Sequence, residues 1–237
     1  ERARARLGVL GLVQQTVLAR GGGLRNVRLQ ANRADLARQA VLVGIGYDSP
    51  GRIDGQARAW DYTPALPGTG VHGTPDPRSP QRRNGGAEAW LEFIETRVKP
   101  WVAGTTRVDT GRQTLYGHSY GGLFVLHTLL ARPQTFQRYV AASPSLWWHA
   151  PYMMRRASDA GDFSHGAPTL HLMAGGAEML RRPGAAPLAT AGATTRLAAI
   201  LAAKPGLSVT LREFPGLSHG AMLPASAQAA AELAAQP

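Results

Sequence analysis

The sequence predicts an α/β fold in which a mostly parallel sheet is flanked by helices. Short apolar runs of strand length alternate along the chain with longer segments whose apolar residues recur at helical spacing, and this alternation is typical of βα units in a parallel sheet. Polar or glycine-rich turns follow several of the apolar runs, where a parallel sheet collects its functional groups. The length of 237 residues suits one such domain with a full core.

Five segments are predicted to be strands, because each is a short and nearly continuous apolar run, as expected for a strand buried on both faces. In chain order they are residues 41–47, 112–116, 136–142, 169–173 and 207–214. A turn is predicted directly after the first of them, at 48–51, because Asp, Ser, Pro and Gly follow one another there.

Helices are predicted between and after the strands. The first begins at Asn84 as its cap, and its apolar residues recur at spacings of three and four, so that they form one face. Those apolar residues are Leu91, Ile94, Val98 and Trp101. Further helices are predicted over residues 121–132, about 190–203, and 224–235.

Two segments do not follow the alternating pattern. Residues 54–83 are rich in Gly, Pro and Arg and show no periodicity, which predicts a long loop of the kind that forms a functional lid or stays disordered. Residues 1–40 contain no evident strand. We therefore predict that residues 41–237 form the α/β domain, and that 1–40 are a truncated or aberrant segment in which the first strands of the sheet are missing.

The apolar residues near the N-terminus are compatible with a helix but do not identify one. Leu7, Leu10, Val13 and Leu18 could line one helical face. The stretch 7–18 follows three arginines but contains Gln14 and lacks a clear cleavage site, so it resembles a signal sequence only weakly. The compartment, cytoplasmic or periplasmic, stays open.

Composition and charge exclude several classes of protein. The formal net charge is +11, carried mostly by scattered arginines, and no nucleic-acid-binding motif is present. This pattern favours a bias in amino-acid composition over a nucleic-acid partner. Attraction of anionic small molecules is expected as a secondary effect of the charge. The lack of cysteine excludes disulfides, a thiolate nucleophile and Cys-ligated metal. No metal-ligand spacing such as HExxH occurs, so neither metal nor cofactor is predicted. No stretch is long and apolar enough to span a membrane, and nothing indicates an oligomeric state.

The motif Gly-x-Ser-x-Gly lies at the centre of the chain, as residues 117–121 with Ser119 in the middle. A predicted strand precedes it and a predicted helix follows, which is the context of a nucleophile elbow. Gly117 and Gly121 allow backbone to pass close to this sharp turn. The helix points its positive end at the place where an oxyanion would form, and the backbone N–H of Tyr120 is the first candidate donor to it.

Two further candidates follow Ser119 at the ends of later strands, in the chain order Ser119, Glu178, His219. This order of serine, acid and histidine is that of α/β hydrolases. Serine is a weak nucleophile at its free pKa, so His219 is predicted to accept its proton, and Glu178 to orient the imidazole. Asp159 and Asp162 also come in the right order but precede their strand, which makes them poorer candidates for the acid.

Three other side chains near the motif are also assigned expected roles. His118 lies inside the elbow and is expected to pack beside the strand or to contact substrate. Trp147 follows a predicted strand and is a candidate to flank an aromatic acyl group. His127, on the predicted helix, is expected to be structural.

Several of these segments together resemble the putative esterase (esterase D-like) family of α/β hydrolases, and within it the trilactone siderophore (enterobactin-type) esterases. The resemblance extends over about residues 41–223. The matching segments are Val-Gly-Ile-Gly-Tyr at 43–47, Arg-Ala-Trp-Asp-Tyr-Thr-Pro at 58–64, the elbow at 116–124, Ala-Ser-Pro-Ser-Leu-Trp-Trp at 142–148 and Ser-His-Gly at 218–220.

The resemblance implies a serine esterase with Ser119 as nucleophile and His219 as base. Some siderophore esterases resemble a Ser–His dyad, which leaves the role of Glu178 open. An arginine near the Asp-Tyr-Thr-Pro segment contacts the anionic substrate in such enzymes, which implies this role for Arg58. Members also begin with further strands, and a loop after an early strand supplies the second oxyanion donor.

The expected function is hydrolysis of carboxylic esters through an acyl-enzyme on Ser119. The expected substrate is a small-molecule ester, such as an anionic catecholate siderophore trilactone or a related aryl ester or polyester. The alternatives are a general carboxylesterase or thioesterase of the esterase D kind, and a catalytically impaired remnant that only binds a ligand.

Overall fold

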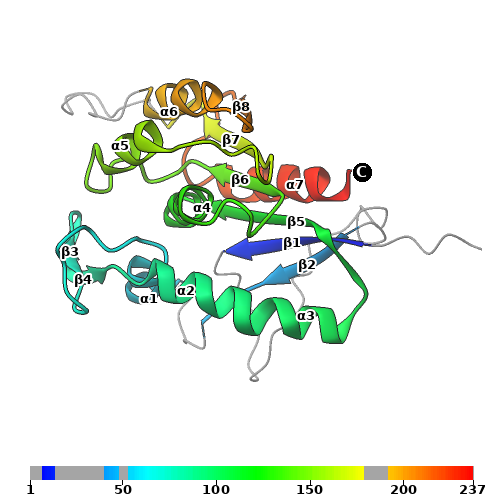
Figure 1. Cartoon of the computed structure of the whole chain (residues 1–237). Coiled ribbons are helices and arrows are strands. Elements are labelled where there is room, and N and C mark those ends of the chain that lie inside the picture. Colours follow the sequence, from blue (N-terminus) through cyan, green and yellow to red (C-terminus); the bar gives the residue numbers. More distant parts are fainter. Residues whose placement is uncertain (1–6, 14–39, 48–52, 179–191, 237) are drawn as a thin grey trace, which may run out of the picture.

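A six-stranded sheet forms the centre of the molecule (Figure 1). The computed structural model describes residues 7–13, 40–47, 53–178 and 192–236. The strands of this sheet are β1 (Leu7–Val13), β2 (Ala40–Gly44), β5 (Val108–His118), β6 (Arg138–Ala142), β7 (Thr169–Gly175) and β8 (Ser208–Phe214). Their order is β2-β1-β5-β6-β7-β8, and every neighbouring pair is parallel.

Helices cover both faces of the sheet. They are α1 (Gly55–Asp61), α2 (Ala87–Phe93), α3 (Lys99–Thr105), α4 (Tyr120–Ala131), α5 (Tyr152–Asp159), α6 (Ala193–Ala202) and α7 (Met222–Ala235), and a π-helical turn (Ile94–Val98) joins α2 to α3. Buried residues of α2, α4, α5 and α6 form one hydrophobic cluster with the sheet. Residues of α7 form a second cluster with it.

The two clusters lie on opposite faces because successive side chains of a strand point to opposite sides. Leu115 of β5 belongs to the cluster with α4, whereas the next residue, Tyr116, belongs to the cluster with α7. In β6, Tyr139 belongs to the cluster with α4, and the next residue, Val140, belongs to the cluster with α7. Strands buried on both faces read as continuous apolar runs, which explains why the sequence identified them.

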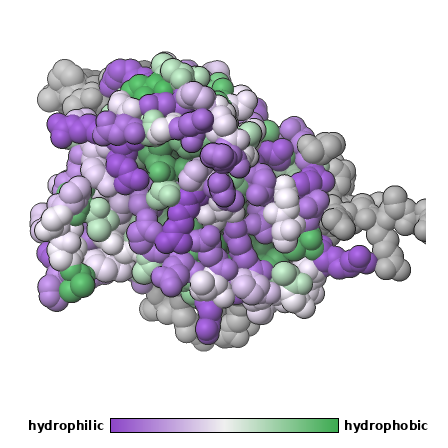
Figure 2. Space-filling model, viewed as in Figure 1, coloured by the Kyte–Doolittle hydropathy of each residue, from purple (hydrophilic) through white to green (hydrophobic). Residues whose placement is uncertain are grey.

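The predicted α/β class is confirmed, and so are the five predicted strands and the helices that follow them. Some bounds differ: β5 begins at Val108, and the last helix begins at Met222. The outer surface is largely hydrophilic on the face seen in Figure 2, where apolar residues form only small separate patches. No helix within the described ranges is long and apolar enough to cross a bilayer.

Residues 7–13 do not form the helix that the sequence allowed there, because this segment is strand β1, in the interior of the sheet between β2 and β5. Its sequence Leu-Gly-Val-Leu-Gly-Leu-Val is a short continuous apolar run, and such a run cannot be assigned by periodicity alone. Thus at least one of the strands predicted to be missing from residues 1–40 is present. The turn predicted at 48–51 lies outside the described residues.

The expected long loop over residues 54–83 is also wrong. It contains α1 and an antiparallel hairpin of β3 (Thr74–Asp76) and β4 (Ser79–Asn84). The side chain of Asp54 caps α1 by accepting hydrogen bonds from the Gln56 and Ala57 amides. Only one residue of this helix is buried, so the sequence carries no periodic apolar signal.

Two details of the first predicted helix are corrected. Asn84 ends β4, and Gly86 is the N-cap of α2. The Asn84 side chain is buried and bonds to the Ala59 carbonyl and to the indole N–H of Trp148. Trp101 is 45% exposed, so it lies off the apolar face.

Candidate active site

Ser119 lies at the turn between β5 and α4, and its backbone has φ 61° and ψ −118°. A positive φ is rare for a residue with a side chain and is kept only where surrounding bonds enforce it. The Ser119 amide donates to the Ala142 carbonyl at 3.0 Å, and its own carbonyl accepts from the amides of Leu123 (3.0 Å) and Ser145 (3.2 Å). These bonds tie the turn to the end of β6 and to the first turn of α4.

Glycine is required on either side of this turn because backbone passes too close for a side chain. A Cβ on Gly117 would lie 2.2 Å from the carbonyl oxygen of Gly121, and one on Gly122 would lie 2.8 Å from the Ala142 oxygen. Both distances are below ordinary van der Waals contact. The sequence motif therefore has the strand-turn-helix geometry of a nucleophile elbow.

The imidazole of His219 reaches the serine from the loop between β8 and α7. Its Nε2 lies 3.0 Å from Ser119 Oγ, within the range for proton transfer between a nucleophile and its base. The side chain of His219 is about half exposed, so substrate and water have access to it. The structure thus brings together the two residues on which the predicted chemistry depends.

The His118 ring packs against the ring of His219 and is not hydrogen-bonded to Ser119 Oγ. Its Nε2 donates to the main-chain carbonyl of His219 at 2.9 Å, and the two ring centroids are 4.6 Å apart. Burial and the nearby His219 lower the pKa of His118 to about 4. His118 is therefore neutral near pH 7, and it supports the loop that carries His219.

Glu178 follows β7 and faces the other nitrogen of the same ring. Its Oε2 is 3.5 Å from His219 Nδ1, while its Oε1 accepts from the Gly175 amide at 3.0 Å and from the Ser143 hydroxyl. Burial raises the pKa of Glu178, but the hydrogen bonds from His219, Ser143 and Gly175 outweigh it and leave the pKa below its usual value. The carboxylate is thus ionised at neutral pH and can stabilise an imidazolium.

Tyr120 is the first residue of α4, so its backbone N–H is among those that have no partner within the helix. Its side chain points to the β3–β4 hairpin, where the hydroxyl donates to the carboxylate of Asp76. Its ring lies 5.6 Å from that of Trp147. Trp147 in turn is covered by the Arg78 guanidinium, 3.5 Å from the ring centroid.

A cleft of about 340 Å³ opens above Ser119. It is lined by Ile53, Gly55, Arg58, Arg82, His118, Ser119, Tyr120, His219, Gly220 and Leu223. Of the predicted substrate-binding residues, Arg58 and His118 line this cleft, whereas Trp147 does not. Sequence reasoning missed Arg82, which reaches the cleft from β4, because it lies in the segment without periodicity.

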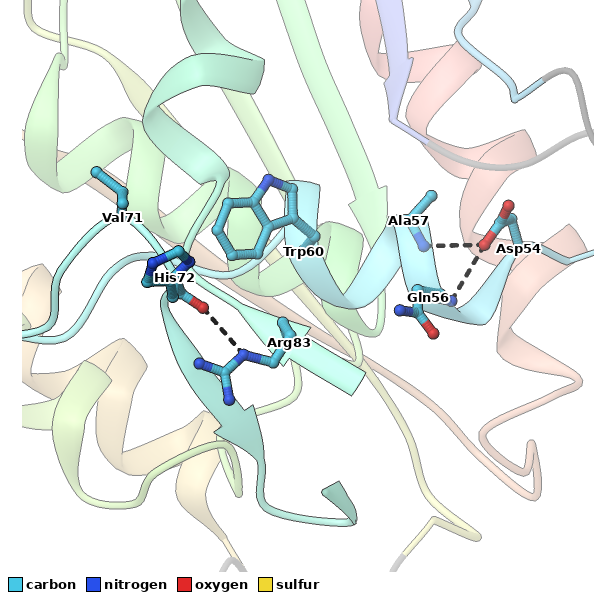
Figure 3. Close-up of a pocket in the computed structure, with 7 residues that line it drawn as sticks. All are labelled: Asp54, Gln56, Ala57, Trp60, Val71, His72 and Arg83. Atoms are coloured by element: carbon cyan, nitrogen blue, oxygen red, sulfur yellow. Dashed lines mark hydrogen bonds between the residues drawn. The ribbon is translucent and has the colours of Figure 1, made fainter. Parts of the chain in front are cut away.

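A larger hollow, about 750 Å³, lies between α1 and the β3–β4 hairpin and contains none of the catalytic candidates (Figure 3). Its lining includes Trp60, His72 and Arg83, and Arg83 donates to the main-chain carbonyls of His72 and Gly73 at 2.9 Å. In the described part of the chain, no group of three or more His, Asp or Glu residues is arranged to hold a metal ion.

Strand β1 changes the expectation for the second oxyanion donor. Val13, its last residue, pairs with Gly117 of β5, two residues before the nucleophile. The C-terminal end of β1 therefore lies beside the elbow, and the second donor of an α/β hydrolase comes from a residue after such a strand. The sequence had offered no strand for this purpose. Residue 14 and those after it lie outside the described residues.

Comparison with known proteins finds esterases that are similar to this chain. A profile of the family described as Putative esterase matches residues 72–178. Over 148 residues the chain is 39% identical to the siderophore enterobactin esterase of Emericella nidulans, which covers 58% of this chain and 48% of that protein. Over 188 residues it is 32% identical to the apo-salmochelin esterase of Escherichia coli O6:H1, which covers 78% of this chain and 57% of that protein.

The fold is also that of solved siderophore hydrolases. The siderophore hydrolase EstA from Aspergillus nidulans has a TM-score of 0.73 at 24% identity, over 99% of this chain and 84% of that one. The predicted family resemblance and fold class are thereby confirmed. The chain spans about half the length of the curated relatives that it matches.

Proposed function

We propose that this protein is a serine esterase that hydrolyses carboxylic esters through an acyl-enzyme on Ser119. The observation that carries the proposal is the 3.0 Å distance between Ser119 Oγ and His219 Nε2, with Glu178 on the far side of the imidazole. A serine at a strained turn, a base within hydrogen-bond reach and an orienting carboxylate are the parts that nucleophilic acyl transfer requires.

In the proposed mechanism, Ser119 Oγ attacks the ester carbonyl while His219 Nε2 accepts its proton. The carbonyl oxygen becomes negatively charged and accepts a hydrogen bond from the Tyr120 N–H at the positive end of α4. The imidazolium then gives its proton to the departing alcohol. Water, deprotonated by the same imidazole, attacks the acyl-enzyme, and the acid leaves as Ser119 regains its proton.

For the substrate we propose an anionic siderophore trilactone or a related aryl ester. Three observations support this class. The relatives carry the names of enterobactin and salmochelin esterases, and two arginines, Arg58 and Arg82, line the cleft of Ser119. The formal charge of +11 would also attract an anionic ligand to the molecule.

A fluorophosphonate probe tests the catalytic centre. We expect stoichiometric labelling that Ser119→Ala abolishes. Ser145→Ala is the matched control, because the Ser145 hydroxyl lies only 3.3 Å from that of Ser119 but has no base beside it in the proposed mechanism. Labelling that survives Ser119→Ala, or no labelling at all, would refute the proposal and favour a remnant that only binds a ligand.

The substrate class is tested by comparing kcat/KM for enterobactin with kcat/KM for neutral p-nitrophenyl esters and thioesters. We expect enterobactin to be preferred. A preference for the simple esters or thioesters would instead identify a general carboxylesterase or thioesterase.

A further inference from the structure

Arg82 brings a second guanidinium to the cleft of Ser119. It belongs to β4 and is half-buried. Its guanidinium packs against the start of α1, where a Cβ on Gly55 would lie 3.0 Å from one of its nitrogens. Because Gly55 has no side chain, Arg82 can lie close to the backbone and still line the same cleft as Arg58. Among the residues that the structure describes, neither arginine forms an ion pair with a carboxylate.

The position of Arg82 relative to the nucleophile is set by two side-chain contacts, which we call the hairpin anchor. Tyr120, next to Ser119, donates its hydroxyl hydrogen to Asp76 in the hairpin, and Arg78 stacks on Trp147. Asp76 is 1% exposed and also accepts from the Arg78 and Ser79 amides at 2.9 and 3.0 Å. The hairpin is thus bonded to the residue that starts α4, so its distance from the elbow is fixed.

Arg82 and the neighbouring residue Arg83 lie at different cavities. Adjacent residues of a strand point to opposite sides, and the Arg83 guanidinium is held by the carbonyls of His72 and Gly73 at the larger hollow (Figure 3). Of these two consecutive arginines, only Arg82 lines the cleft with Ser119. The two positive charges of the cleft therefore come from two different elements, α1 and β4.

We propose that Arg82 is a specificity-determining residue, which binds the anionic part of the substrate together with Arg58 while the ester lies at Ser119. This inference rests on the proposed function and deepens it. A guanidinium offers several donors in a planar fork that matches carboxylates and other oxyanions. The chemistry it recognises is an oxyanion on the acyl side of the ester, such as a phenolate or carboxylate.

The test compares two esters that share one acyl ring and differ in charge: 4-nitrophenyl benzoate and 4-nitrophenyl 3-sulfobenzoate. For Arg82→Gln we expect kcat/KM of the sulfonated ester to fall about tenfold relative to that of the neutral ester, as for the loss of one hydrogen bond to a charged group. Arg82→Lys should restore part of the loss. Arg83→Gln is the matched control and should leave the ratio of the two esters unchanged.

Equal effects of Arg82→Gln on both esters, or the same change of ratio in Arg83→Gln, would overturn the inference. A binding measurement separates it from the proposed function. Calorimetric binding of 3-sulfobenzoate to the intact protein needs no catalysis, and it should weaken about tenfold in Arg82→Gln but not in Arg83→Gln. If binding of 3-sulfobenzoate weakens only in Arg82→Gln but the unmodified protein is not labelled by fluorophosphonate, the esterase proposal fails and the role of Arg82 stands. If the unmodified protein is labelled but Arg82→Gln and Arg83→Gln bind 3-sulfobenzoate equally well, the esterase proposal stands and the role of Arg82 fails.

Discussion

Glu178 Oε2 lies 3.5 Å from His219 Nδ1, half an ångström farther than the 3.0 Å that separates the opposite nitrogen of the ring from Ser119 Oγ. The carboxylate's other oxygen is engaged by Ser143 and the Gly175 amide. At 3.5 Å a hydrogen bond is at the limit of ordinary geometry. The acid is therefore coupled less tightly to the imidazole than the imidazole is to the serine.

This difference in distance predicts that substitution of His219 lowers kcat more than substitution of Glu178 does. His219→Ala should lower kcat by about 10⁴-fold or more, as the loss of a triad base does. Glu178→Gln should lower it only about 10- to 100-fold, which corresponds to one hydrogen bond to a charged group. Steady-state hydrolysis of the preferred ester measures both. Equal losses would show that Glu178 is as essential as the base and that the contact shortens when substrate binds.

A second prediction concerns the close backbone approach at the elbow. Gly117→Ala should lower the free energy of unfolding by about 2–3 kcal/mol, because its Cβ would lie 2.2 Å from the Gly121 oxygen and the turn would have to shift. Fluorophosphonate labelling should be lost with it. Urea denaturation measures the first effect, and mass spectrometry the second.

Gly104→Ala is the matched control for that substitution. Gly104 lies within α3, and a Cβ there would meet no atom within 4 Å. Alanine has the better helix propensity, so this variant should be as stable as the unmodified protein, or more stable by up to ~1 kcal/mol. If Gly117→Ala unfolds at the same urea concentration as Gly104→Ala, the turn has room for a side chain at position 117, and the steric argument is wrong.

The strands and the elbow could be predicted from sequence because their signals are local. A strand such as β6 is a short apolar run, and the motif around Ser119 fixes a strand, a turn and a helix within a few residues. The order of Ser119, Glu178 and His219 could be read because each follows a strand, and parallel strands end at one edge of the sheet.

The remaining features depend on contacts that local patterns do not encode. Strand β1 is apolar at both helical and strand spacing, and only pairing with β2 and β5 decides between them. The hairpin was missed because Asp76, the last residue of β3, finds its partner Tyr120 forty-four positions later. Arg82 reaches the cleft only through that pairing, so nothing in its neighbouring residues marks it.

A third prediction tests the hairpin anchor by a double-mutant cycle. Tyr120→Phe and Asp76→Asn should each lower the free energy of unfolding by about 1–2 kcal/mol, since each weakens a partly buried, charge-assisted hydrogen bond. Because both substitutions weaken the same contact, the effect of the double variant should fall short of the sum of the single effects by about 1 kcal/mol. Urea denaturation of the four proteins measures this coupling.

The control for the cycle pairs Asp76→Asn with Tyr152→Phe. The Tyr152 hydroxyl accepts from Arg156 within α5 and is not bonded to Asp76. These two substitutions should therefore be additive. If the effects of Asp76→Asn and Tyr120→Phe are also additive, the hairpin is not held to the elbow by this bond.

The fourth prediction is a pH dependence that originates at His118. Burial, with the nearby His219, lowers the pKa of His118 from its ordinary 6.5 to about 4 in the folded protein. Between these two values the unfolded chain carries a proton on this ring that the folded protein lacks. The free energy of unfolding should therefore fall as the pH drops from 6.5 to 4, by about 3 kcal/mol from this residue alone.

His118→Gln isolates this contribution from those of the carboxylates. Glutamine cannot be protonated in this range, yet its amide can donate the bond that His118 gives to the His219 carbonyl. The difference in unfolding free energy between pH 7 and pH 4.5, measured in urea, should shrink by up to about 2–3 kcal/mol in this variant. His72→Gln, at an exposed site, serves as the control and should keep the original difference. If both variants lose stability between the two pH values as the unmodified protein does, His118 is protonated as easily inside the fold as outside it, and its role as a neutral support for the His219 loop is wrong.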